Sequence, residues 1–142
     1  MISVYESIAR WLMFDVLSQI QPTHVVVDAE TIPNWAQFEN AGIFASPNDF
    51  STTLMGGQTK NTEFKSFYIK RRFNSEQNRQ DNEVFKEKLM RIIREKNLNY
   101  EMPNDGRDWI SIEVNAGIYP AQRQEDSSFA DYLIPLKLEY ID

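Results

Sequence analysis

Residues 63–73 (Glu63-Phe64-Lys65-Ser66-Phe67-Tyr68-Ile69-Lys70-Arg71-Arg72-Phe73) run directly into Asn74-Ser75-Glu76, and the change of pattern at this junction decides the fold class. Along the first stretch, apolar side chains fall on one side and mostly polar ones on the other. This period of two predicts a strand with one solvated face. Asn74 or Ser75 can then cap a helix, and Glu76 places a negative charge in its first turn. The junction therefore predicts a strand followed by a helix.

The helix that begins near Ser75 is expected to span residues 75–97. Its apolar positions recur with helical spacing, which predicts one buried face. The residues of this stripe are Val84, Phe85, Leu89, Ile92 and Ile93. Pro103 and the turn formers Asn104-Asp105-Gly106 follow the helix and predict a return to extended chain.

A second amphipathic helix is predicted over residues 3–20. Ser3 can cap it, and Glu6 stands three residues later, as in a capping box. Its predicted buried face consists of Tyr5, Ile8, Ala9, Leu12, Met13, Val16, Leu17 and Ile20. Glu6, Arg10 and Asp15 interrupt the apolar run, so we expect neither a secretory signal nor a membrane span.

Further strands are predicted on both sides of the helix 75–97. Residues 23–32 are rich in β-branched side chains, and residues 33–60 are expected to form short strands joined by turns. Residues 132–140 alternate strictly, and Pro135 within them is expected at a sheet edge or a bulge because it has no backbone donor. In residues 110–118 one face is expected to carry Ile110, Ile112, Val114, Ala116 and Ile118, opposite Trp109.

These elements predict a single α+β domain over residues 1–142, with two helices packed on a mainly antiparallel sheet in the order α-β-β-β-α-β-β. The chain has 15 Lys and Arg against 21 Asp and Glu, a net charge of −6, and no cysteine. The negative charge disfavours direct nucleic-acid binding and attachment to anionic membranes. The lack of cysteine excludes disulfides, thiolate nucleophiles and Cys-ligated metals from this chain.

Candidate chemistry from the sequence is sparse. His24 is the single histidine and has no second His or Cys to complete a soft metal site, so we interpret it as structural or incidental. Asp28 and Glu30 would share a strand face, as an acid–base pair requires, but alternation produces the same pair on any solvated strand. We therefore predict no catalytic residue, no cofactor and no metal.

Three other motifs have ordinary structural explanations. The Asn104, Asp105 and Asp108 group around Gly106 lacks EF-hand spacing and reads as a turn. The segment Gly56-Gly57-Gln58-Thr59-Lys60 lacks the P-loop spacing and leads into a strand instead of a helix. The basic run Lys70-Arg71-Arg72 could meet a phosphate or an acidic partner, but alternation splits its side chains, which favours a solvated strand end.

The order of elements and several motifs resemble the small minor capsid or tail-completion proteins of siphophages and prophages of Gram-positive bacteria, a group similar to tail terminators. The matching features are Ile8-x-x-Trp11-Leu12, the strand 64–73 leading into Asn74-Ser75-Glu76-Gln77, Asn82-x-x-Phe85, the stretch Asn115-Ala116-Gly117-Ile118-Tyr119, and Tyr132-x-Ile134-x-Leu136-x-Leu138-x-Tyr140. Residues 33–60 match poorly. In the helix 75–97, Ile92 or Ile93 stands where proteins of this group often have an aromatic residue.

The resemblance implies a structural virion protein, made in the host cytoplasm, that is not an enzyme. It would form a ring, possibly a hexamer, that ends or completes the tail and meets the tail-tube and head-completion proteins. Exposed aromatic residues are the expected interface, and the candidates are Trp35, Phe38, Phe44, Phe50 and Tyr119. Two alternatives remain open: a small-ligand-binding or enzymatic cytosolic α+β domain, and a cytosolic adaptor unrelated to phage.

Overall fold

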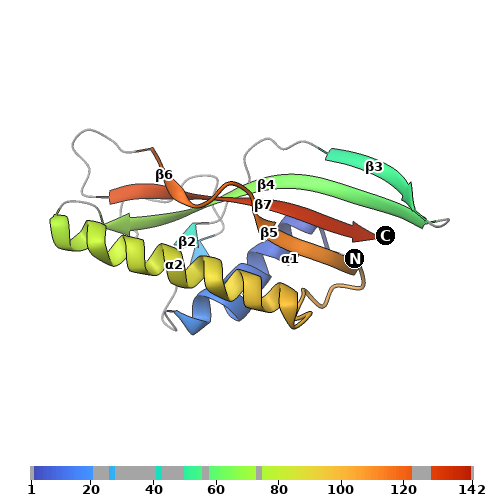
Figure 1. The fold of residues 1–142 in the computed structure, drawn as a ribbon, viewed down its shortest axis with the longest axis horizontal. Coiled ribbons are helices and arrows are strands. Elements are labelled where there is room, and N and C mark those ends of the chain that lie inside the picture. Colours follow the sequence, from blue (N-terminus) through green and yellow to red (C-terminus); the bar gives the residue numbers. More distant parts are fainter. Residues whose placement is uncertain are drawn as a thin grey trace.

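The computed structural model describes residues 2–20, 26–27, 41–42, 50–55, 58–72, 75–122 and 129–141 (Figure 1). In chain order the elements are α1 (Val4–Arg10), the π-helical turn η1 (Trp11–Val16), the 3₁₀ turn η2 (Leu17–Gln19), β1 (Val26–Val27), β2 (Ala41–Gly42), β3 (Phe50–Met55), β4 (Gln58–Arg72), α2 (Glu76–Leu98), β5 (Asp108–Val114), β6 (Tyr119–Gln122) and β7 (Phe129–Ile141). The α+β class is confirmed. In this part of the chain four strands precede α2 and three follow it. The expected order had three strands before this helix and two after it.

The main sheet is antiparallel and follows the order β3-β4-β7-β5, with β6 pairing with β7 beyond the end of β5. Its centre is the long pairing of β4 with β7, from Lys60 opposite Ile141 to Arg72 opposite Phe129. Both helical segments lie on one face of this sheet (Figure 1). Strands β1 and β2 form a separate short parallel pair.

The core lies between the helices and the sheet. Alternate residues of β7, Tyr132, Ile134, Leu136, Leu138 and Tyr140, are buried there, as the period of two predicts. Phe67 and Ile69 of β4 face the same layer. Because one face of each element supplies this layer, the fold needs only the one-sided patterns found in the sequence.

Helix α2 agrees closely with its prediction, including its cap, because the Ser75 hydroxyl accepts a hydrogen bond from the Asn78 amide at 3.1 Å. Four of the five stripe residues are buried. Val84 is the exception, with 51% of its surface exposed. Each helical step turns by about 100°, which carries Val84 from Phe85 to the side away from the stripe. Asn82 is buried in the stripe instead.

The N-terminal segment is helical from Val4 to Gln19, close to the predicted 3–20, but it does not remain an α-helix. Ser3 caps it by accepting from the Glu6 amide at 3.1 Å. The Glu6 carboxylate bonds to Arg10 at 2.7 Å. At Trp11 the hydrogen bonding widens into η1, and the buried indole donates to the Glu101 carbonyl at 2.9 Å. A wider turn lets Trp11 and Leu12 both enter the core.

Strand β5 corrects the predicted alternation of residues 110–118. Trp109 pairs with Tyr140 and Ser111 with Glu139, so Ile110 is the extra residue of a bulge. The bulge reverses the expected faces: Trp109 is buried and Ile110 is exposed. The strand then ends at Val114, and Ala116 has a positive φ of 73°. Ala116 and Ile118 therefore lie beyond β5 instead of on its inner face, although Ile118 is buried.

Pro135 lies in the central strand β7, and the described pairings of β7 have no register shift at this residue, so the expectation of a sheet edge or a bulge is wrong. On one side β7 pairs with β4. On the other, β5 reaches only to Leu136 and β6 begins opposite Leu133. The Pro135 carbonyl accepts from the Asn115 amide at 2.8 Å, so its donorless nitrogen faces this interruption between the two neighbouring strands. The break in the partner strand makes a proline tolerable there.

Two other predicted regions are only partly described. Within the predicted strand 23–32, the structure describes Val26–Val27, which forms β1. Within residues 33–60 it describes β2, β3 and the start of β4, in agreement with short strands at those positions. The other positions of both regions lie outside the described residues. Among the helices that are described, none has the length and apolarity needed to cross a membrane.

Candidate functional site

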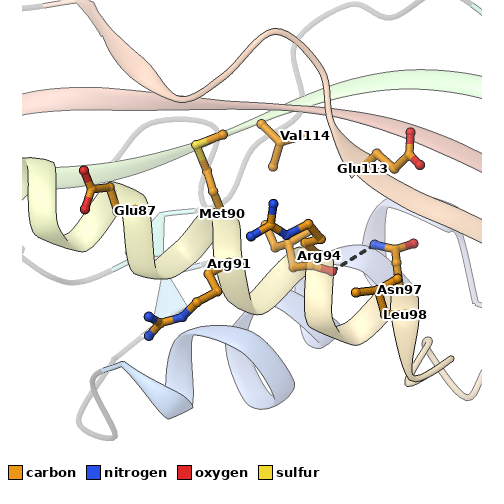
Figure 2. Close-up of a pocket in the computed structure, with 9 residues that line it drawn as sticks. Glu87, Met90, Arg91, Arg94, Asn97, Leu98, Glu113 and Val114 are labelled. Carbon is orange, nitrogen blue, oxygen red and sulfur yellow. Dashed lines mark hydrogen bonds between the residues drawn. The ribbon is translucent and has the colours of Figure 1, made fainter.

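A groove of about 540 Å³ lies between helix α2 and the edge strand β5 (Figure 2). We call it the α2–β5 groove. Helix α2 supplies most of its lining and the end of β5 supplies the rest. The residues are Glu87, Met90, Arg91, Ile93, Arg94, Asn97, Leu98, Glu113 and Val114. Ile93 also belongs to the hydrophobic core, so the groove is continuous with the core.

Asn97 fixes the spacing of the groove. Its side-chain nitrogen donates to the carbonyls of Ile93, at 2.9 Å, and Ile112. Its side-chain oxygen accepts from the Ile112 amide at 2.6 Å. One amide thus satisfies both backbone groups of Ile112 on the side of β5 away from β7. The last turn of α2 is thereby tied to β5, so the two walls are held at a set separation.

The walls are apolar and open to solvent. Met90 is 38% exposed and Leu98 is 77% exposed, although neither side chain carries a polar group. In Figure 2 the Met90 side chain reaches toward Val114 across the groove. Exposed apolar side chains around a concave surface are typical of sites that bind a ligand or another protein.

Charged side chains border the groove. Figure 2 shows Arg94 reaching toward Val114, whereas Arg91 points away from β5. Arg91 lies 4.0 Å from Glu95 on the next helical turn. Glu87 and Glu113 add carboxylates at the rim, and all four residues are exposed. The described lining contains no Ser, Thr, Cys, His or Lys, and its ionisable groups are the two carboxylates and two guanidinium groups named above.

Asp105 forms a separate polar cluster that joins α1 to the start of β5. Its carboxylate accepts hydrogen bonds from the Ser7 hydroxyl at 2.6 Å, the Arg107 amide at 3.0 Å, the Arg107 guanidinium at 2.7 Å and the Trp109 indole at 2.9 Å. Burial alone would raise the pKa of Asp105, but these donors outweigh it and lower the pKa. Asp105 therefore stays ionised and holds two distant segments together.

The predicted turn around Gly106 thus has a structural role that the sequence did not reveal. Gly106 has a φ of 89°, which suits glycine in a tight turn. The Asp105 oxygens face hydrogen-bond donors in the protein, an arrangement that opposes calcium binding. In the part of the chain that the structure describes, no group of three or more His, Cys, Asp or Glu residues is arranged to hold a metal ion.

Arg71 corrects the interpretation of the basic run as a solvated strand end. It is buried, and its Nε donates to the Asn82 side-chain oxygen at 2.9 Å. Its guanidinium carbon lies 4.0 Å from the centre of the Phe85 ring, which provides a cation–π contact. Burial raises the pKa of Tyr132 in the same cluster. Arg71 thus anchors β4 to α2, while the side chains of Lys70 and Arg72 lie outside the described set.

Lys60, the lysine of the glycine-containing segment, lies in an antiparallel strand and forms an ion pair. Its Nζ is 2.8 Å from a Glu139 oxygen, and Lys137 is 3.1 Å from the other oxygen. The hydrogen bond from Lys60 is the main cause of the lowered pKa of Glu139. Residues 56–57 lie outside the described residues, but a lysine paired in this way within a strand does not resemble a P-loop lysine.

The predicted site residues are only partly placed. His24, Asp28 and Glu30 lie outside the described residues, as do the candidate interface residues Trp35, Phe38 and Phe44. Phe50 begins β3, opposite Glu63 of β4. Tyr119 begins β6, opposite Leu133 of β7. The side chains of Phe50 and Tyr119 are not among those described, and neither residue belongs to the described lining of the α2–β5 groove.

Sequence reasoning missed the groove, although one signal was available. Met90, Arg94 and Leu98 recur every four residues along one side of α2, away from the core stripe. The apolar ends of this series, Met90 and Leu98, do not match a fully solvated helix face. The contribution of Val114 was not visible, because it depends on which helix side meets β5.

Comparison with known protein families finds no matching family model, and comparison with curated proteins finds no match.

Proposed function

We propose that this chain is a structural subunit of a phage or prophage virion, a tail terminator or head–tail joining component that acts as an oligomeric ring. The single observation that carries the assembly role is the α2–β5 groove, a concave surface whose apolar walls are left in solvent. A subunit that works only in an assembly is expected to expose such a surface when alone.

The resemblance to tail-completion proteins supplies the virion context. Its motif residues Ile8, Trp11 and Leu12 are all buried in the core. The alternating series of residues 132–140 forms the inner face of the central strand β7. A resemblance carried by residues that build a core supports a related fold. The fold leaves the outer surfaces free to specify partners.

The partners in this proposal are other copies of the chain, the tail-tube protein and the head-completion proteins. Neither nucleic acid nor membrane is a direct partner, since the chain carries a net charge of −6. In this proposal the protein is not an enzyme, and it acts in the virion after synthesis in the host cytoplasm. Trp35, Phe38, Phe44, Phe50 and Tyr119 remain candidate contacts with these partners.

Assembly in a lysate that lacks this protein tests the proposal. Tails of uncontrolled length, or tails unable to join heads, are expected, and purified wild-type protein should restore joining. Electron microscopy of the tails and plaque assays measure the two outcomes. Normal tails and infectious particles without the protein would exclude the proposed role.

A small-ligand-binding domain is the second candidate, because about 540 Å³ lies within the usual range of ligand pockets. An apolar molecule with one carboxylate would suit walls that carry Met90, Leu98 and Arg94. Thermal denaturation in the presence of medium-chain carboxylates tests this candidate. A rise in midpoint that is lost in Met90→Asp would favour it over assembly.

A further inference from the structure

We propose that Phe14 of one copy of this chain docks in the α2–β5 groove of a second copy, with Asp15 facing Arg94. This inference rests on the proposed function as an assembly subunit and identifies the two surfaces that would meet. It joins two features of the described structure that single-chain packing does not use: an exposed aromatic side chain and an apolar groove.

Phe14 is an unusual surface residue. It lies in η1 and is 66% exposed, while its neighbours Trp11, Leu12 and Val16 are buried. The surrounding turn is well ordered by hydrogen bonds, since the Ser18 hydroxyl donates to the Phe14 carbonyl and the Gln19 side chain donates to the Asp15 carbonyl at 3.0 Å. Phe14 is therefore presented on a hydrogen-bonded turn, and a preformed turn lowers the entropy cost of docking.

The groove suits an aromatic side chain in size and polarity. Its volume of about 540 Å³ falls in the range that accepts whole small molecules, so one ring and its neighbours can enter. Met90, Ile93 and Val114 supply apolar surface around the floor. Aromatic residues that fill apolar pockets are common anchors of protein interfaces.

Charge complementarity favours a second copy as the occupant. Asp15 is exposed next to Phe14, and Arg94 reaches over the groove (Figure 2). Glu87 and Glu113 at the rim would repel Asp15, so Asp15 has to face the Arg94 side of the groove. Arg10 lies one turn before Phe14 and is paired with Glu6 at 2.7 Å, which brings both signs of charge to the same surface. Acidic and basic groups thus flank the aromatic side chain on one surface and the groove on the other.

The two surfaces are different parts of one chain, because Phe14 is not a lining residue of the groove and belongs to another helical segment. A contact between unlike surfaces is heterologous. Such contacts produce closed rings or open filaments, whereas a contact between like surfaces produces a dimer. This geometry is the one that a terminating ring requires.

Disulfide trapping tests the inference directly, because the chain contains no native cysteine. The variant Asp15→Cys/Arg94→Cys keeps Phe14 and the apolar walls. On mild oxidation we expect a ladder of covalent oligomers on a non-reducing gel, with peptides joined through positions 15 and 94 identified by mass spectrometry. Single-cysteine variants can form only dimers.

Two matched controls make the result specific. Gln80 is exposed on α2 and lies outside the groove, so Asp15→Cys/Gln80→Cys should give at least tenfold less trapping. Adding Phe14→Ala to the first pair should reduce the ladder similarly, while adding Val84→Ala should leave it unchanged. Equal trapping in the Gln80 control, or a ladder insensitive to Phe14→Ala, would overturn the inference.

The outcome also separates this inference from the proposed function. If lysine-reactive cross-linking shows oligomers in the assembling lysate while positions 15 and 94 never join, copies meet through another surface. The groove contact is then wrong, and the ring role stands. If the protein forms no oligomer in that lysate and its removal leaves the tails normal, both proposals fail.

Discussion

Helix α2 and the N-terminal helical segment pack on the same face of the sheet, but they meet the core in different ways. α2 stays an α-helix from Glu76 to Leu98. The N-terminal segment changes from α to π to 3₁₀ between Val4 and Gln19. The long helix has enough turns to spread its buried side chains along one stripe, whereas the short one must bring a tryptophan into the core within two turns.

The comparison shows that burial and hydrogen-bond register are set separately. In both segments the apolar spacing determines which side faces the sheet. The register then adapts where a large side chain has to fit, as at Trp11 in η1. Phe14 is exposed, in agreement with the predicted buried face, which does not include it.

The largest expected effect is that of Trp11→Ala. The change removes a fully buried indole and its hydrogen bond to the Glu101 carbonyl, so it should lower the free energy of unfolding by about 3–5 kcal/mol. Urea denaturation followed by circular dichroism measures the loss. Phe14→Ala is the matched control and should change stability by less than about 0.5 kcal/mol. Equal effects of the two changes would show that η1 is not packed as described.

Phe85→Ala applies the same test to α2. Phe85 is buried against the sheet and contacts the Arg71 guanidinium. The cost should be about 3 kcal/mol, somewhat below that of Trp11→Ala because less volume is removed and the long Arg71 side chain can move into the space. The adjacent Val84→Ala should be nearly neutral. A large effect at Val84 would reverse our assignment of the helix face.

Asp105→Asn tests how the N-terminal segment is held to the sheet. Loss of the charged acceptor for Ser7, Arg107 and Trp109 should cost about 1–3 kcal/mol at neutral pH. Because folding lowers the pKa of Asp105, its contribution is complete above the unfolded pKa and is lost as pH falls through the folded pKa.

The stability difference between wild type and Asp105→Asn should therefore shrink on acidification below about pH 4. Denaturation midpoints at several acidic pH values measure this trend. A difference that is independent of pH would mean that the Asp105 carboxylate is not the origin of the effect.

The smallest expected effects come from the helix caps. Ser75→Ala should cost about 1 kcal/mol because the Asn78 amide loses its acceptor. Ser3→Ala removes the equivalent bond to the Glu6 amide and should cost less, because α1 spans 7 residues whereas α2 spans 23. Ser75→Asp should retain most of the stability. If Ser3→Ala proves the more damaging change, the first turn of α1 contributes more to folding than its short length implies.

Much of the fold follows from local patterns in the sequence. The limits of both helical segments and the inner face of β7 depend on spacing that is visible residue by residue. The patterns do not show where one strand of a pair carries an extra residue. The bulge at Ile110 exchanges the faces of Trp109 and Ile110, and it is determined by the pairing of β5 with β7.

The candidate site was less accessible to sequence reasoning for a related reason. The α2–β5 groove is formed by a helix side and a strand end that meet only in the tertiary structure. Asp105 reads as an ordinary turn residue, because its partner Ser7 is far away in the sequence. The sequence pattern predicts a solvated Arg71, because alternation alone does not show that Arg71 contacts Asn82 and Phe85 of α2.

The bond pattern of Asn97 has a consequence for how copies of this chain can associate. An exposed edge strand invites another strand to pair with it, which leads to continuous sheets and aggregation. Because the Asn97 amide already occupies both backbone groups of Ile112, an incoming strand cannot extend the sheet across β5 without displacing it. Asn97 therefore protects this part of the β5 edge from strand pairing between copies, even at high protein concentration. One asparagine on a helix thus closes this part of the sheet edge to further strand addition.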